Sequence, residues 1–161
     1  MIEFDFKGIN IEARVEMIPH DYLDGDIRYN RQRTRFDRNV KVFVQFWEFR
    51  IHNGNLYELA FIKSTLNYFI HSCWKRSIKE GGKIDLDKAL FHESSYVTPS
   101  SLHFVARQKD NKHFLHIFLR QDGNVKECYL DLHEVTMLDI AIGKIISLLT
   151  PKVVEAQECL F

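Results

Sequence analysis

The feature that most constrains the fold is a strand–turn–strand–helix pattern over residues 113–149. An apolar run at 114–119 predicts a strand, and Asp122-Gly123-Asn124 predicts the tight turn after it. A second strand is predicted over 125–132. A helix is then predicted by apolar residues spaced three and four apart, namely Val135, Leu138, Ile142, Ile145 and Leu149. This spacing gives the helix one apolar side, which must pack on a core.

Two acidic residues mark the expected start of this helix. Asp131 and Glu134 stand three positions apart, which is the spacing of a capping box. In that motif each side chain bonds the backbone N–H of the other residue. Asp takes the place of the more usual Ser or Thr at the cap.

A similar strand–turn–strand–helix pattern occurs earlier in the chain. It appears when residues 52–55 are aligned with residues 121–124. The strand predicted over 40–51 then aligns with 109–120. A return strand is expected at 56–62, and Ser64 is expected to cap a helix that ends near Arg76. Its apolar positions align with those of the later helix and are Leu66, Phe69 and Cys73. Duplication and two independent hairpin–helix units both explain the pattern.

Shorter signals complete the expected architecture. Residues 3–6 and 9–17 alternate as two strands around a Lys7-Gly8 turn, and Pro151 is expected to end the last helix. Together these patterns predict an α+β fold in which two pseudo-repeated units each have antiparallel strands followed by a helix. The units span 1–81 and 82–151 in a single domain, with a C-terminal tail at 152–161.

Composition narrows the function classes. The 161 residues suit one domain, 45% of them are hydrophobic, and the formal net charge is zero, so charge alone indicates neither a nucleic-acid nor a membrane partner. The cysteines lack the short spacing of a zinc or disulfide motif. No signal peptide or spanning segment is expected, which favours a cytoplasmic protein. The scattered histidines and the absence of known catalytic motifs predict no catalytic residues, no cofactor and no metal.

Three adjoining stretches carry a family resemblance. They are Leu102-His-Phe-Val-Ala-Arg-Gln-Lys-Asp-Asn-Lys-His-Phe-Leu-His-Ile-Phe-Leu-Arg120, then Asp122-Gly123-Asn124, then Tyr129-Leu-Asp-Leu-His133 before the helix. This order resembles the Whirly and purine-rich-element-binding (Pur) group of single-stranded nucleic-acid-binding proteins. The resemblance implies four antiparallel strands and a helix in each unit, two paired units, a binding surface for single-stranded DNA or RNA, and a homodimer.

A long segment without strand or helix period, residues 20–39, is rich in arginine. Guanidinium groups neutralise phosphates and stack on bases, so this loop and the strand after it are candidate binding elements. The candidates are Arg28, Arg31, Arg33, Arg35, Arg38 and Lys41. Alternatively, the arginines pair with Asp21, Asp24 and Asp26 on a solvated loop.

Aromatic side chains alternate along two predicted strands. In the later strand, Leu115, Ile117 and Leu119 are expected to face the core. The opposite face and its counterpart in the earlier strand give the candidates Phe43, Trp47, Phe49, Phe114, His116, Phe118 and Arg120. Bases of a single strand stack on such surfaces. The alternative is burial of this face beneath a helix or a second subunit.

The C-terminal residues form a third candidate site. Gln157, Leu160 and Phe161 have the Gln-x-x-Leu-Phe pattern by which replication and repair proteins dock on the bacterial sliding clamp. Leu160 and Phe161 would fill an apolar groove, and Gln157 would bond at its rim. The alternative is a tail that folds back on its own core.

These observations favour a non-enzymatic single-stranded nucleic-acid-binding protein, tethered to a sliding clamp by its tail. The alternative is a small protein-interaction module, such as an immunity or inhibitor protein, that uses the aromatic sheet face as a protein interface. The sequence distinguishes neither DNA from RNA nor one base from another.

Overall fold

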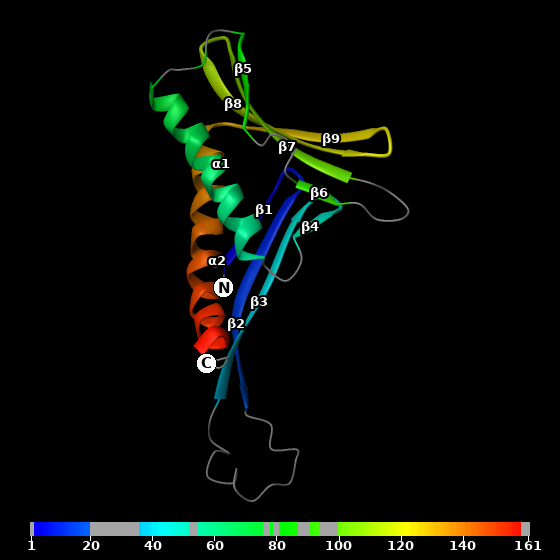
Figure 1. Cartoon of the computed structure of the whole chain (residues 1–161). Coiled ribbons are helices and arrows are strands. Elements are labelled where there is room, and N and C mark those ends of the chain that lie inside the picture. Colours follow the sequence, from blue (N-terminus) through cyan, green and yellow to red (C-terminus); the bar gives the residue numbers. More distant parts are fainter. Residues whose placement is uncertain are drawn as a thin grey trace, which may run out of the picture.

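A computed structural model describes residues 2–19, 36–51, 55–75, 78, 81–86, 91–93 and 100–158. The first half forms an antiparallel sheet in the order β1-β2-β3-β4, followed by one helix (Figure 1). Its elements are β1 (Ile2–Phe6), β2 (Ile9–Pro19), β3 (Phe36–Phe46), β4 (Phe49–Ile51) and α1 (Leu56–Lys75).

The second half repeats this arrangement. Its antiparallel sheet has the order β5-β7-β8-β9, with β6 also paired to β7, and a helix follows. The elements are β5 (Lys83–Asp85), β6 (Phe91–Glu93), β7 (Ser100–Lys109), β8 (Lys112–Gln121), β9 (Asn124–Leu130) and α2 (Leu132–Glu158). The predicted α+β fold of two strand–helix units is therefore confirmed.

The two helices pack against each other and run in opposite directions along one side of the sheets (Figure 1). Their fully buried residues have the same spacing: Leu59, Ile62, Leu66 and Phe69 in α1, and Val135, Leu138, Ile142 and Ile145 in α2. Lys63 on α1 bonds Asp139 on α2 at 2.9 Å. The capping box predicted at the start of α2 is also present, with Glu134 N 2.8 Å from Asp131 Oδ1 and Asp131 N 3.2 Å from Glu134 Oε1.

The start of the first helix differs from the prediction. The stretch expected as a strand at 56–62 forms the first turns of α1, and Ser64 lies inside the helix. Asn55 is the cap, because its Oδ1 accepts the N–H of Tyr57 at 2.9 Å. The proper match between the two units therefore aligns Asn55 with Asp131, and the expected alignment of 52–55 with 121–124 is wrong.

The long strand expected over 40–51 is instead two strands. A turn at Trp47, whose φ is 53°, reverses the chain so that Phe46 pairs with Phe49. Both side chains consequently lie on the core side, with Phe49 only 5% exposed.

The last helix continues past Pro151 and ends at Glu158. Proline removes one backbone N–H from the helix and its ring crowds the carbonyl four residues earlier, but here the helix continues through this position. The tail predicted from residue 152 therefore belongs to α2 over most of its length.

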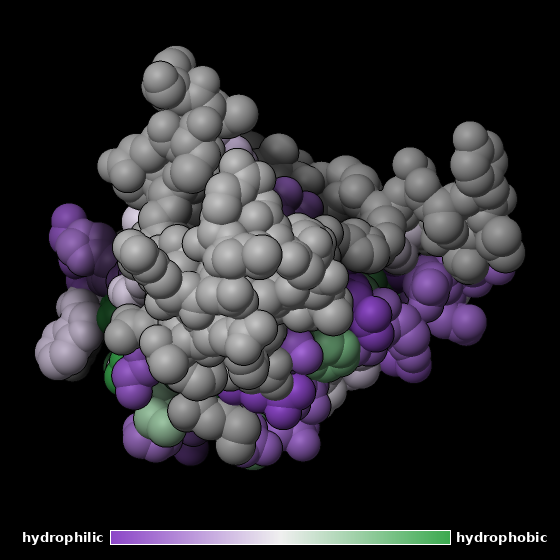
Figure 2. All heavy atoms as spheres, turned by 90° about the horizontal axis from the view of Figure 1, so that it is seen from below, coloured by the Kyte–Doolittle hydropathy of each residue, from purple (hydrophilic) through white to green (hydrophobic). Residues whose placement is uncertain are grey.

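The core joins the two sheets to the helix pair. Phe46 from β3 and Phe104 from β7 are fully buried, with ring centroids 5.9 Å apart in an edge-to-face arrangement. Seen from below, most of the coloured surface is hydrophilic, with small hydrophobic areas between (Figure 2). Within the described ranges, no helix has the length and apolar character to cross a bilayer.

Candidate nucleic-acid interface

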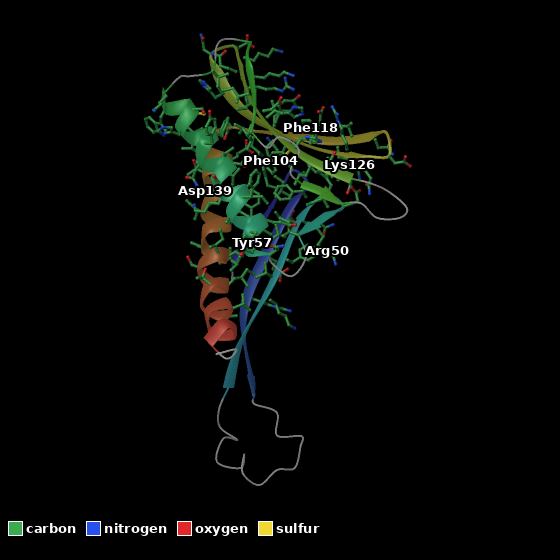
Figure 3. All side chains as sticks on the ribbon, in the orientation of Figure 1. Arg50, Tyr57, Phe104, Phe118, Lys126 and Asp139 are labelled. Carbon is green, nitrogen blue, oxygen red and sulfur yellow. The ribbon has the colours of Figure 1, made fainter. Side chains whose placement is uncertain are left out.

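The second sheet has one buried and one open face. Leu115, Ile117 and Leu119 on β8 are at most 1% exposed, which confirms their predicted place in the core. The alternate residues of β8 lie on the opposite side from Phe104, as Phe118 does in Figure 3. We call this second side the outer face of the second sheet.

Four rings from three strands meet on this outer face. His103 on β7 stacks on Phe118 of β8, with centroids 4.8 Å apart and planes 14° apart. His116 on β8 stacks on Tyr129 of β9 at 4.4 Å and 5°. The two pairs touch through His116 and Phe118, at 4.9 Å. We call these four residues the ring cluster.

Charged side chains surround the ring cluster. The guanidinium carbon of Arg120 lies over the Phe118 ring, 5.3 Å from its centroid. Arg107 Nε donates to His116 Nδ1 at 3.1 Å, and His116 Nε2 lies 2.7 Å from Glu127 Oε2. Because Nδ1 accepts a hydrogen bond, the imidazole carries its proton on Nε2 and donates it to Glu127. The network fixes the orientation of the His116 ring.

The predicted members of this face have different exposures. His116 is only 7% exposed, so it supports its neighbours and offers little surface of its own. Phe114 and Phe118 are half-buried, and Arg120 is exposed. All four lie on the predicted face of β8, which the structure therefore brings together.

Sequence reasoning missed four residues that complete the site, namely His103, Arg107, Glu127 and Tyr129. They come from β7 and β9, and strand pairing places His103 beside Phe118 and Tyr129 beside His116. Alternation along residues 125–130 was the available signal, since it places Glu127 and Tyr129 on one face. Of the four, Tyr129 offers the largest exposed aromatic surface, at 45%.

The first sheet carries its own outer-face candidates. Lys41 is exposed and Phe43 is half-buried, as expected for the face opposite Val44 and Phe46. The guanidinium carbon of Arg50 lies 5.1 Å from the Phe43 ring centroid. An arginine over a phenylalanine therefore occurs on both sheets.

Two predicted stacking residues are not available for stacking on a base. Phe49 faces the core after the turn at Trp47, and this overturns its expected place beside Phe43. Trp47 is half-buried and packs on Gly8. The backbone N–H of Trp47 donates to the carbonyl oxygen of Gly8 at 2.8 Å. The tight turn between β3 and β4 causes both changes.

The remaining candidates belong to the arginine-rich segment and to the C-terminus. Arg28, Arg31, Arg33 and Arg35 lie outside the described residues, as do Leu160 and Phe161. Arg38 is on β3 opposite Met17, and Gln157 is in the last turns of α2. The clamp-docking pattern and most of the arginine segment therefore stay predictions.

Among the described residues, metal binding and thiol chemistry find little support. In the ranges that the structure describes, no group of three or more His, Cys, Asp or Glu is placed to hold a metal ion. Burial raises the pKa of Cys73 to about 11 and that of Cys128 to about 12. These two thiols therefore stay protonated near neutral pH and are poor nucleophiles.

A shallow hollow of about 420 Å³ lies beside the turn of the β8–β9 hairpin. Glu48 and Lys126 line it and form an ion pair between the two sheets. Because its two charged side chains already pair with each other, the ring cluster is the better candidate site.

No family model, curated protein or solved structure matches this chain. Side-chain geometry is therefore the basis on which a function can be assigned.

Proposed function

We propose that this protein binds single-stranded nucleic acid, without catalysing a reaction, on the outer face of the second sheet. The ring cluster, flanked by Arg107 and Arg120, is the observation that supports this proposal. Base stacking on aromatic side chains contributes about 1–3 kcal/mol per base and tolerates any base. Arginine adds phosphate contacts and stacking of its own.

The charge on this face indicates whether base stacking or phosphate contacts contribute more to binding. Lys83, Arg107 and Arg120 lie on it together with Asp85 and Glu127, so the local excess of positive charge is small. Two phosphate contacts from arginine correspond to a slope of about −1.4 in a plot of log affinity against log salt, at about −0.7 per contact. We therefore expect stacking to contribute more than charge and the salt dependence to be shallow.

A titration of fluorescein-labelled oligonucleotides, followed by fluorescence anisotropy at low salt, tests the proposal. A single strand should bind more tightly than the duplex of the same sequence, because duplex bases are already stacked on one another. A single strand of abasic sites with equal charge should bind weakly. No binding to any oligonucleotide, or equal affinity for the duplex, would contradict the proposal.

Arg120→Ala locates the interface on the second sheet. The variant should lower single-strand affinity and reduce the salt slope by about 0.7, the value of one phosphate contact. Arg50→Ala is the matched control, since Arg50 lies over Phe43 on the first sheet as Arg120 lies over Phe118 on the second. Equal losses in both variants would place the contact elsewhere.

A protein-interaction module is the second candidate function. Its support is the set of large apolar side chains exposed on the helices: Tyr57, Tyr68, Trp74, Met137 and Ile140. Exposed apolar side chains that gather on one surface mark protein interfaces. Binding to a protein partner through such side chains should change little with salt, whereas binding to nucleic acid should weaken as salt is raised.

A further inference from the structure

The rings of the cluster stand on edge upon the second sheet. His116 and Tyr129 are cross-strand neighbours, so the line between their centroids runs from β8 to β9. Parallel rings with centroids 4.4 Å apart are too close to lie side by side in one plane, so they must be face to face. Their faces therefore look along the sheet, across the strands, and not out toward solvent.

This orientation determines which ring face is open. His116 has Tyr129 on one side and Val105, which is 4% exposed, as its neighbour on the other. Tyr129 covers His116 with one face, and its other face looks past β9. Because β9 is the last strand in the order of the described sheet, Tyr129 is the open end of the stacked pair.

Tyr129 is also held in place from outside the sheet. Its backbone carbonyl accepts a hydrogen bond from Lys7 Nζ at 2.9 Å. Lys7 is in turn paired with Glu134 at the start of α2, at 3.2 Å. The strand beneath the ring is thus fixed to the β1–β2 turn and to α2, so the open face has a defined position.

A carboxylate also lies near Tyr129 along β9. Glu127 is two residues from Tyr129 on the same side of β9, and its Oε2 is held by His116. Within the part of the chain that the structure describes, Oε1 has no protein partner, and the side chain is 49% exposed. An ionised carboxylate only accepts hydrogen bonds, so this oxygen favours a ligand with N–H groups.

We infer that a nucleobase stacks on the outward face of Tyr129 and extends the His116–Tyr129 pair by one ring, with Glu127 accepting an N–H from the exocyclic amino group of that base. This site rests on the proposed function and gives it a preferred ligand. Adenine, cytosine and guanine carry such an amino group. Thymine and uracil have carbonyl oxygens there, and these repel a carboxylate.

Tyr129→Ala tests the stacking, with binding measured by anisotropy on oligocytidine, oligoadenine and oligothymine single strands. The affinity of every strand should fall about 5- to 150-fold, the change that corresponds to a lost stacking contact of about 1–3 kcal/mol. Tyr129→Phe keeps the ring and should bind as the wild type does. The control is Tyr57→Ala. Tyr57 is 89% exposed and lies on α1, away from the outer face of the second sheet, so this variant should leave affinity unchanged.

Glu127→Gln tests the base preference, which is read as the ratio of affinities for oligocytidine and oligothymine. Wild type should favour cytosine by about tenfold, the effect of one hydrogen bond to a charged group. The amide also donates hydrogen bonds, so the variant should lose most of this preference even if its overall affinity rises. Glu3→Gln, an exposed acidic residue on β1, is the matched control.

The outcomes separate this site from the proposed function. Wild type that binds no single strand would overturn both. Wild type that binds, together with a Tyr129→Ala variant of equal affinity, would preserve the proposed function and overturn the stacking site. An unchanged base ratio in Glu127→Gln would overturn the role of the carboxylate. A melting curve for each variant confirms that the fold is intact.

Discussion

Trp47 packs directly on Gly8 and so joins two turns of the first sheet. The backbone N–H of Trp47 donates to the Gly8 carbonyl oxygen at 2.8 Å, and the indole covers the α-carbon so closely that a side chain there would overlap it. Gly8 has a φ of +86° in the β1–β2 turn, and Trp47 has a φ of 53° in the β3–β4 turn. The glycine therefore satisfies two requirements, left-handed backbone and close approach.

Gly8→Ala should lower the free energy of unfolding by about 2–5 kcal/mol. The left-handed backbone accounts for about 1–2 kcal/mol of this, and displacement of the indole accounts for the remainder. Gly123→Ala is the control, since Gly123 has a φ of +80° but a Cβ added there would meet no atom of the described residues within 4 Å. It should show the backbone cost alone. Equal losses in urea unfolding would mean that the indole moves aside at little cost.

Asn55→Ala should destabilise the protein by about 1 kcal/mol, the usual cost of removing an N-cap side chain. The capping bond from Tyr57 N to Asn55 Oδ1 is the reason. Ser64→Ala should change stability by less than about 0.5 kcal/mol, because Ser64 is exposed inside α1, where alanine is a good helix former. Urea unfolding of both variants measures the difference. A larger loss for Ser64→Ala would place the start of the helix at Ser64.

Stability should fall at alkaline pH because of Cys128. Burial, together with Glu127 and Glu134, raises the pKa of its thiol to about 12 from an ordinary value of 9.0, and Lys7 partly opposes this. A raised pKa in the folded state means that the contribution is complete below about pH 9 and is lost as pH rises toward 12. The expected loss is on the order of 1 kcal/mol between pH 9 and 10.

The measurement is urea unfolding of wild type and Cys128→Ala at several values between about pH 8 and about pH 10.5, which spans the ordinary thiol pKa. Lysine and tyrosine titrate in the same range in both proteins, so the difference between the two curves isolates the thiol. That difference should shrink as pH rises. Parallel curves would show that the thiolate is tolerated in the fold.

Deleting Leu160 and Phe161 tests the clamp-docking prediction. If these residues are a clamp-docking peptide, they contribute little to the fold, and the truncated chain should melt at nearly the wild-type temperature. It should also lose binding to a purified bacterial sliding clamp, since two anchors carry most of the affinity of a short peptide. A clear drop in melting temperature would indicate about 3–5 kcal/mol of lost apolar burial and would contradict clamp docking.

The strand faces of the second unit were predictable because alternation is a local property. Leu115, Ile117 and Leu119 had to share a face, and the apolar content of that face made it the core. The capping box of Asp131 and Glu134 was predictable for the same reason, since its bonds span only three residues. Signals of this kind require no knowledge of the partner strand.

The start of α1 was not predictable in this way. Residues 56–62 are mostly apolar, so their pattern suits a buried strand as well as a helix. Asn55 is equally suited to a hairpin turn and to an N-cap. Contact between Leu59 and the core, which the sequence cannot show, decides between the two. The error at this position also displaced the alignment of the two units.

The site itself depends on register, which a single strand does not reveal. The stacking of His103 on Phe118 and of His116 on Tyr129 requires three strands to pair at particular residues. The network from Arg107 through His116 to Glu127 requires the same pairing. The sequence could therefore name the β8 residues of this face but not their partners.

The contact between Lys7 and the Tyr129 carbonyl has a consequence for solubility. An unpaired edge strand is a template on which another chain can add a strand, and sheets that grow in this way aggregate. At Tyr129 the outward carbonyl of β9 is already bonded to an ammonium group, which is itself paired with Glu134. An incoming strand would have to displace both charges before it could bond there. Lys7 thereby protects this edge against polymerisation of the sheet.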